Sequence, residues 1–162
     1  KPVKVRLADV SRGLHKGPVI ISGTLVSIKP GSGLVSVCSQ CFRRMINGQC
    51  PVHGVVDPET DLRLRAILDD GTDTTILRGD RDLVERIMGK RMEALKQEAR
   101  EKMDQEFVKK ELISILAGHP MKVTGDPLFD DYGMTLQAKE IEIGFDIDEV
   151  KEEIASILGV IA

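Results

Sequence analysis

The chain has 162 residues, of which 41% are hydrophobic and 30% are charged, and its formal net charge is −3. This composition is that of a globular protein with a core of its own, which excludes disordered and disulfide-dependent classes. Apolar runs stay short of the roughly 20 residues of a membrane span, and residues 1–12 lack a signal-peptide core, so we expect a cytoplasmic protein with no membrane partner.

The charge is unevenly distributed along the chain. Residues 1–65 carry ten lysines and arginines against four aspartates and glutamates, whereas residues 66–162 carry thirteen against twenty-two. A basic N-terminal half can present a phosphate-attracting face even when the total charge is negative. The net charge therefore does not exclude a nucleic-acid partner.

The first third of the chain predicts extended structure interrupted by an insert. After an arm over residues 1–17, the Val- and Ile-rich stretch 18–29 predicts a long strand. The turn sequence Pro-Gly-Ser-Gly at 30–33 is followed by a second extended stretch at 34–37. A short segment rich in Cys and His follows at 38–53.

The stretch 61–68 alternates between apolar and polar residues, as a half-buried strand does. One face holds Leu62, Leu64, Ala66 and Leu68, and the other holds Arg63, Arg65 and Ile67. The Asp-Asp-Gly-Thr sequence at 69–72 predicts a hairpin turn into a strand at 73–78.

The second half predicts helices followed by two further strands. Asp80 is a suitable N-cap, and Gly89 ends or kinks the helix that it begins. A second helix is predicted over 90–117. Strands are predicted at 121–124 and 134–143, joined by a loop.

Five strands with a helical segment between the third and the fourth follow the order of the OB-fold, a small Greek-key barrel. Strand order alone leaves other folds open. We predict a mainly β protein with helices (α+β), in which a five-stranded OB barrel occupies residues 18–145 and an amphipathic helix occupies residues 146–162.

The insert at 38–53 contains the metal-ligand pattern Cys38-x2-Cys41-x8-Cys50-x2-His53. Two pairs at this spacing place four soft ligands on two tight turns, which suits tetrahedral Zn²⁺. The alternatives are buried thiols, or a redox pair with a spare cysteine. We predict a zinc ribbon with one structural Zn²⁺ per chain, because four protein ligands leave no open position for catalysis.

Four segments together resemble a known family: GTLVSIKPGSGLVSVCSQC, CPVHG, DLRLRAILDDGT and LVERIMGKRMEAL. Over residues 18–145 they are similar to the zinc-bearing C-terminal OB domain of the large subunit of replication protein A, above all in its archaeal forms. The sequence departs from that pattern at His53, where many relatives have cysteine, and in its few aromatic residues.

The resemblance implies binding of single-stranded DNA in DNA replication, repair and recombination. It also implies a heterotrimer with two other replication protein A subunits, joined through a bundle of C-terminal helices. In a prokaryote, such a protein would be associated with the nucleoid.

An OB-fold binds single strands with a basic groove and aromatic stacking platforms. The candidate DNA-binding residues are the basic and aromatic side chains of the outer strand face, the insert and the last loop: Arg63, Arg65, Arg78, Phe42, Arg43, Arg44, Phe129, Tyr132 and Lys122. Each has a simpler interpretation, since outer-face charges are usually only solvated and the phenylalanines can fill small local cores.

The last predicted helix has an apolar stripe formed by Ile147, Val150, Ile154, Ile157, Leu158 and Ile161. An exposed stripe of this kind predicts association with other helices. Two alternative functions stay open, namely a pure scaffold subunit with little DNA contact and a zinc-ribbon OB-fold RNA-binding or translation-related factor. The chain has no phosphate-cradling loop and no catalytic triad pattern, so we do not expect an enzyme.

Overall fold

The computed structural model describes residues 1–144 and 147–161, with the side chains at 147–150, 153, 160 and 161 left out. The elements in chain order are β1 (Val3–Lys4), α1 (Leu7–Ser11), β2 (Val19–Ile28), β3 (Gly33–Cys38), β4 (Pro58–Asp69), β5 (Thr74–Gly79), α2 (Arg81–Met88), α3 (Met92–Glu101), α4 (Phe107–Leu116), β6 (Pro120–Asp130), β7 (Gly133–Ile143) and α5 (Ile147–Ile161). None of these helices has the length and apolar character of a membrane span.

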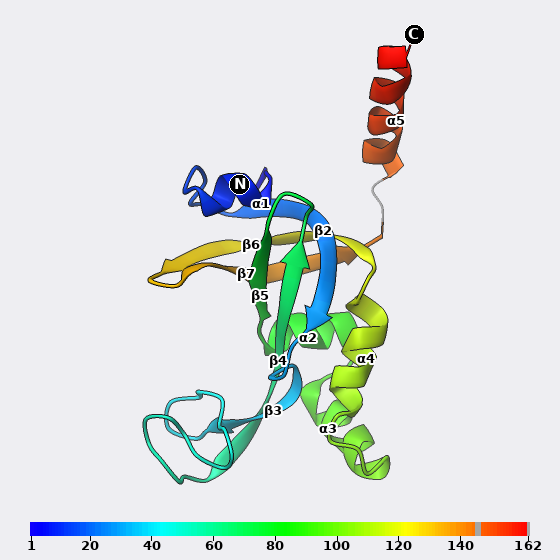
Figure 1. The fold of residues 1–162 in the computed structure, drawn as a ribbon. Helices are drawn as coiled ribbons and strands as arrows, with labels where there is room; N and C mark the ends of the chain where they lie inside the picture. Colours follow the sequence, from blue (N-terminus) through cyan, green and yellow to red (C-terminus); the bar gives the residue numbers. More distant parts are fainter. Residues whose placement is uncertain (145–146, 162) are drawn as a thin grey trace.

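The strands close into a barrel (Figure 1). β2 pairs with β4 on one side and with β6 on the other, and β5 and β7 pair in parallel to complete the ring. Helices α2 to α4 connect β5 to β6. The OB-fold prediction is confirmed, because this is a closed Greek-key barrel with helices between its third and fourth barrel strands.

The barrel interior is filled by the apolar face that the alternation in β4 predicts. Leu62, Leu64 and Leu68 are at most 1% exposed, whereas Arg63 and Arg65 between them are only half-buried. Burial of each leucine is worth roughly 1.5–3 kcal/mol, so the register of β4 is strongly specified. The arginines are thereby fixed on the outer face.

The prediction of one continuous helix over 90–117 is wrong, because the chain breaks between α3 and α4. Met103 adopts a left-handed conformation with φ 52°, and the Asp104 N–H donates to the carbonyl of Ala99. The Asp104 carboxylate then accepts from the N–H of Glu106 at 3.0 Å as the next helix begins. A residue in the left-handed region ends a helix, and a charged stretch offers little apolar surface to hold the two parts in line.

The predicted loop between the last two strands is mostly strand. β6 and β7 pair from Met121↔Ile143 to Asp130↔Gly133, with an irregularity between Thr124 and Gly125. A Cβ on Gly125 would lie 2.4 Å from the carbonyl oxygen of Gln137, so glycine is required at this close approach. The two strands therefore project from the barrel as one long hairpin, the β6–β7 hairpin (Figure 1).

The N-terminal residues, expected as an arm, contain β1 and α1. Leu7 and Val10 of α1 are fully buried in the main core. The turn between β4 and β5 caps this helix, because the Asp70 carboxylate accepts from the N–H of Leu7 at 2.7 Å and the Thr72 hydroxyl accepts from the N–H of Ala8. Burial opposes ionisation of Asp70, but hydrogen bonds from Leu7 and Thr72 outweigh it and lower the pKa of this carboxyl group.

Helix α5 stands away from the barrel (Figure 1). Its described side chains, from Lys151 to Leu158, are all exposed, including Ile154, Ile157 and Leu158 at 51–59%. The side chains of Ile147, Val150 and Ile161, which belong to the same predicted stripe, lie outside the described residues.

Candidate metal centre and nucleic-acid interface

Two tight turns of similar design carry the four predicted metal ligands. In the first turn, the N–H of Phe42 donates to the carbonyl of Cys38, and the N–H of Gln40 points at the Cys38 sulfur at 3.4 Å. In the second, the N–H groups of Gly54 and Val52 make the equivalent contacts to the carbonyl and the sulfur of Cys50. N–H groups directed at a sulfur favour its thiolate form, which is the form that binds metals.

The four ligand atoms of Cys38, Cys41, Cys50 and His53 lie within 4.8 Å of one another. His53 Nδ1 is 3.5 Å from the Cys38 sulfur and 3.6 Å from the Cys50 sulfur, and the sulfurs of Cys41 and Cys50 are 3.5 Å apart. A tetrahedral ion with metal–sulfur bonds of about 2.3 Å and metal–nitrogen bonds of about 2.0 Å places its ligands roughly 3.5–3.8 Å apart. The three short distances match this geometry, so the group could hold a metal ion.

The pKa shifts of the cluster differ from one ligand to the next, since burial raises the pKa of the Cys38 thiol and hydrogen bonds with Cys50 and Cys41 raise the pKa of the His53 ring. Burial opposes ionisation of the Cys50 thiol, but hydrogen bonds from the backbone of His53 and Val52 and from the His53 ring lower its pKa to about 6. At neutral pH this thiol is therefore largely deprotonated. The insert's own core consists of Cys38, Met45 and Cys50, so two of its three buried residues are ligands.

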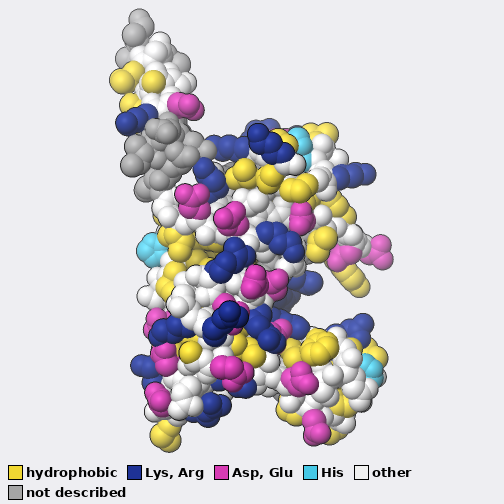
Figure 2. Space-filling model, turned by 180° about the vertical axis from the view of Figure 1, so that it is seen from behind, with side chains coloured by type: hydrophobic (Ala, Val, Ile, Leu, Met, Phe, Trp, Pro, Cys, Tyr) yellow, Lys and Arg dark blue, Asp and Glu magenta, His cyan; other side chains and the backbone are white. Residues whose placement is uncertain are grey.

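Five of the predicted DNA-binding residues line one hollow of about 570 Å³ between the insert and the outer face of the barrel. They are Arg43, Arg44, Arg63, Arg65 and Arg78. We call this hollow the arginine groove. Figure 2 shows a recess between the lobe formed by the insert and the β6–β7 hairpin, with basic side chains along it.

Three residues of the groove form a row across the sheet. Arg65 of β4 pairs with Arg78 of β5, and Arg78 pairs in turn with Gln137 of β7. Like charges directly opposite each other on neighbouring strands destabilise a sheet. Within the part of the chain that the structure describes, no carboxylate pairs with Arg65 or Arg78, so the row presents positive charge that no ion pair neutralises.

Gln137 was not among the predicted site residues. The sequence signal that could have found it is the alternation of β7, where Leu136 and Ala138 are buried and Gln137 points outward. Its place beside Arg78 depends on the parallel pairing of β5 with β7, which the sequence does not reveal.

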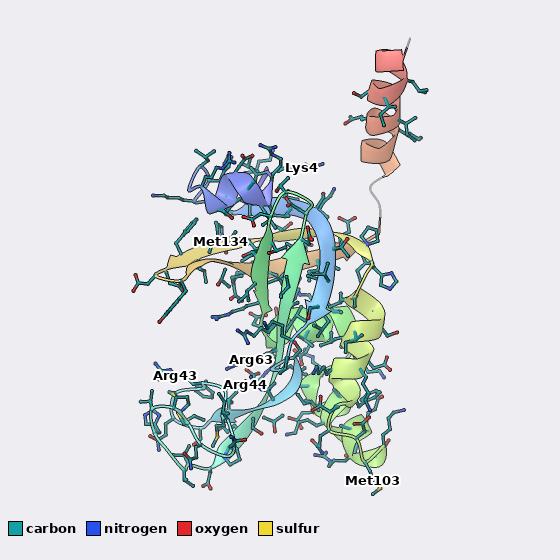
Figure 3. All side chains as sticks on the ribbon, viewed as in Figure 1. Lys4, Arg43, Arg44, Arg63, Met103 and Met134 are labelled. Atoms are coloured by element: carbon teal, nitrogen blue, oxygen red, sulfur yellow. The ribbon has the colours of Figure 1, made fainter. Side chains whose placement is uncertain are left out.

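Arg63 holds the insert against the barrel. Its guanidinium donates to the carbonyl oxygen of Phe42 in the insert and forms an ion pair with Asp61 at 3.0 Å. Asp61 also pairs with Arg81 at 2.9 Å, which neutralises one of the two acids that line the groove. Figure 3 shows Arg63 near Arg43 and Arg44, where the insert meets the barrel.

The other four predicted DNA-binding residues do not line the arginine groove. Phe42 is 54% exposed on the insert, so it does not form that segment's core. Phe129 pairs with Met134 near the end of the β6–β7 hairpin, and Tyr132 is 99% exposed at its tip. Lys122 lies on β6, opposite Ser22 and Glu142.

No family model and no curated protein sequence matches this chain. Among solved structures, a chain of a replication protein A heterotrimer bound to single-stranded DNA is similar at a TM-score of 0.60 and 15% identity, over 96% of this chain and 39% of that chain. A chain from yeast replication protein A bound to single-stranded DNA is similar at a TM-score of 0.60 and 13% identity, over 100% of this chain and 99% of that chain. At such identities, the likeness shows a shared fold.

Proposed function

We propose that this chain binds single-stranded DNA in the arginine groove, as a subunit similar to those of replication protein A. The observation that carries the proposal is the row of Arg65 and Arg78 facing each other without a carboxylate partner among the described residues. The groove lies on β4 and β5, which are the second and third strands of the barrel, beside the insert that follows the first. OB-folds bind oligonucleotides on this face.

The ionic partner of the row is a chain of phosphates rather than a single anion. Arg43 and Arg44 come from the insert, whereas Arg65 and Arg78 come from the barrel, so the positive charges line one hollow from two sides. The acids that also line it are engaged elsewhere, since Asp61 pairs with two arginines and Asp80 caps α2 through the N–H of Leu83. A basic track of this kind follows a phosphate backbone.

Replacing Arg65 and Arg78 together with alanine should weaken binding of a poly-pyrimidine DNA by at least about tenfold. Two lost phosphate contacts should also reduce the slope of log affinity against log salt by about 1.4. The measurement is a fluorescence titration at several salt concentrations, with Arg100→Ala on α3 as the control because Arg100 bonds Gln97 on its own helix and does not line the groove. Unchanged affinity in the double variant would place DNA elsewhere.

Tyr132→Ala should cost about 1–3 kcal/mol of binding free energy if the exposed ring at the tip of the hairpin stacks on a base. Tyr132→Phe keeps the ring and should bind as the unchanged chain does. The same titration measures both variants. An alanine variant with full affinity would mean that the hairpin tip does not contact the nucleic acid.

We further propose that the metal is one structural Zn²⁺ held by Cys38, Cys41, Cys50 and His53. Three thiolates and one imidazole are a donor set typical of structural zinc, and they fill a tetrahedral coordination shell. The ion would hold the two turns together and so position Arg43 and Arg44, without taking part in any reaction. The proposed function is therefore one of binding, not of catalysis.

A scaffold role is the second candidate function, and the exposed aliphatic side chains of α5 favour it. In the proposed arrangement, residues 18–145 form the DNA-binding barrel, and residues 146–162 join two other replication protein A subunits in a helix bundle. Competition between poly-pyrimidine DNA, matched RNA and duplex separates the functions. Preference for single-stranded DNA supports a role in replication, repair and recombination, whereas preference for RNA supports the translation-related alternative. Absence of binding to any of the three supports the scaffold role.

A further inference from the structure

A second hollow of about 230 Å³ adjoins the arginine groove at the base of the insert. Gly31 and Arg44 line both hollows, so the two are neighbours that share one boundary. The Arg44 guanidinium lies across the backbone at this boundary, since a Cβ on Gly31 would be 3.3 Å from Arg44 Nη1. The second hollow therefore adjoins the arginine groove at Arg44.

The boundary between the two hollows is held in place by the turn that connects β2 to β3. The buried Ser32 hydroxyl accepts from the N–H of Arg65 and donates to its carbonyl, both at 2.9 Å. Gly33 lets α4 approach closely, because a Cβ there would lie 2.8 Å from the backbone nitrogen of Lys109. The first turn of α4 is thereby packed against β3, which places Lys109 at the second hollow.

Lys109 is a cation of this hollow that has no partner among the described residues. Its side chain is half-buried, and no ion pair or hydrogen bond of its ammonium group occurs among the described residues. The next residue, Lys110, pairs with Asp104 at 2.8 Å and does not line the hollow. Partial burial of an unpaired charge is costly, and an anion beside it offsets that cost.

We infer that a single-stranded nucleic acid leaving the arginine groove passes Arg44 and continues into the second hollow, where Lys109 contacts a backbone phosphate. This inference rests on the proposed function. The lining includes Glu106 as its acidic residue against Arg44 and Lys109, so the positive charge prevails. The bound length is then set by both hollows, within the range of about 4–16 nucleotides that OB-folds cover.

The test uses the full chain and two oligothymidylates, of about 6 and about 16 nucleotides, near the ends of that range. Lys109→Ala should weaken binding of the long oligonucleotide about fivefold and reduce its salt slope by about 0.7, while the short one binds unchanged. Lys110→Ala is the matched control and should change neither. Arg44→Ala should weaken binding of both lengths, because Arg44 lines both hollows.

Equal loss for both lengths in Lys109→Ala, or no loss for either, would overturn the inference while leaving the proposed function intact if Arg65→Ala still weakens binding. If the unchanged chain binds neither oligonucleotide, the proposed function and the inference both fail. A loss confined to the long oligonucleotide supports the second hollow as part of the binding track.

Discussion

Removing the metal with a strong chelator is expected to unfold the insert while the barrel stays folded. The insert has only Cys38, Met45 and Cys50 as buried residues, and two of these are ligands, so little apolar burial is left without the ion. Apparent zinc-binding energies of about 10–16 kcal/mol in small zinc domains show how much folding free energy such a site supplies. The barrel has a separate and much larger core.

Elemental analysis of freshly purified protein should find one zinc per chain, and hydrogen exchange after chelation should show loss of protection over the insert, residues 38–53, alone. Affinity for single-stranded DNA should fall at the same time, because Arg43 and Arg44 form one wall of the groove and Arg63 contacts the carbonyl of Phe42.

Two ligand variants sharpen the test of the metal centre. His53→Cys keeps four soft ligands and should retain the ion, whereas Cys50→Ser removes a buried thiolate and should lose it. Native protein without zinc, or a disulfide between Cys38 and Cys41 or Cys50, would contradict the proposed site.

The main architecture could be predicted from the sequence where one local pattern determines burial. The alternation in β4 fixes which residues enter the barrel, and the spacing of Cys38, Cys41, Cys50 and His53 places four possible metal ligands on two turns that lie together in the structure. Arg63 and Arg65 follow as outer-face residues because a strand alternates between its two faces. These inferences require no knowledge of how distant segments pair.

Features that depend on pairing between distant segments could not be predicted. The direct opposition of Arg65 and Arg78 results from the register of β4 and β5, and the separate role of Arg63 results from its contact with the insert. The burial of α1 depends on Asp70 and Thr72, which cap that helix from a turn more than sixty residues away. Lys109 reads as an ordinary charged helix residue until Gly33 brings α4 against β3.

Disrupting the apolar stripe of α5 is expected to release this chain from its complex as a folded, zinc-loaded monomer. Ile154, Ile157 and Leu158 follow a spacing of three and one, which places them on one face of the helix, and all three are exposed. A closed barrel is already filled by its own side chains, so it has no surface that needs this helix. An uncovered aliphatic stripe favours association, and a bundle with helices of two other subunits would bury it.

The variant is Ile154→Glu with Leu158→Glu, and the control is Lys151→Ala with Glu152→Ala, which changes exposed polar positions of the same helix. With an affinity tag on this chain in its native host, the unchanged protein and the control should co-purify two other OB-fold subunits, each in an amount equal to that of this chain. The glutamate variant should purify alone and still bind oligothymidylate in the arginine groove, because that groove lies wholly on the barrel and the insert. A glutamate variant that retains its partners, or an unchanged chain that is a stable monomer at micromolar concentration, would contradict the helix bundle and leave α5 without an assembly role.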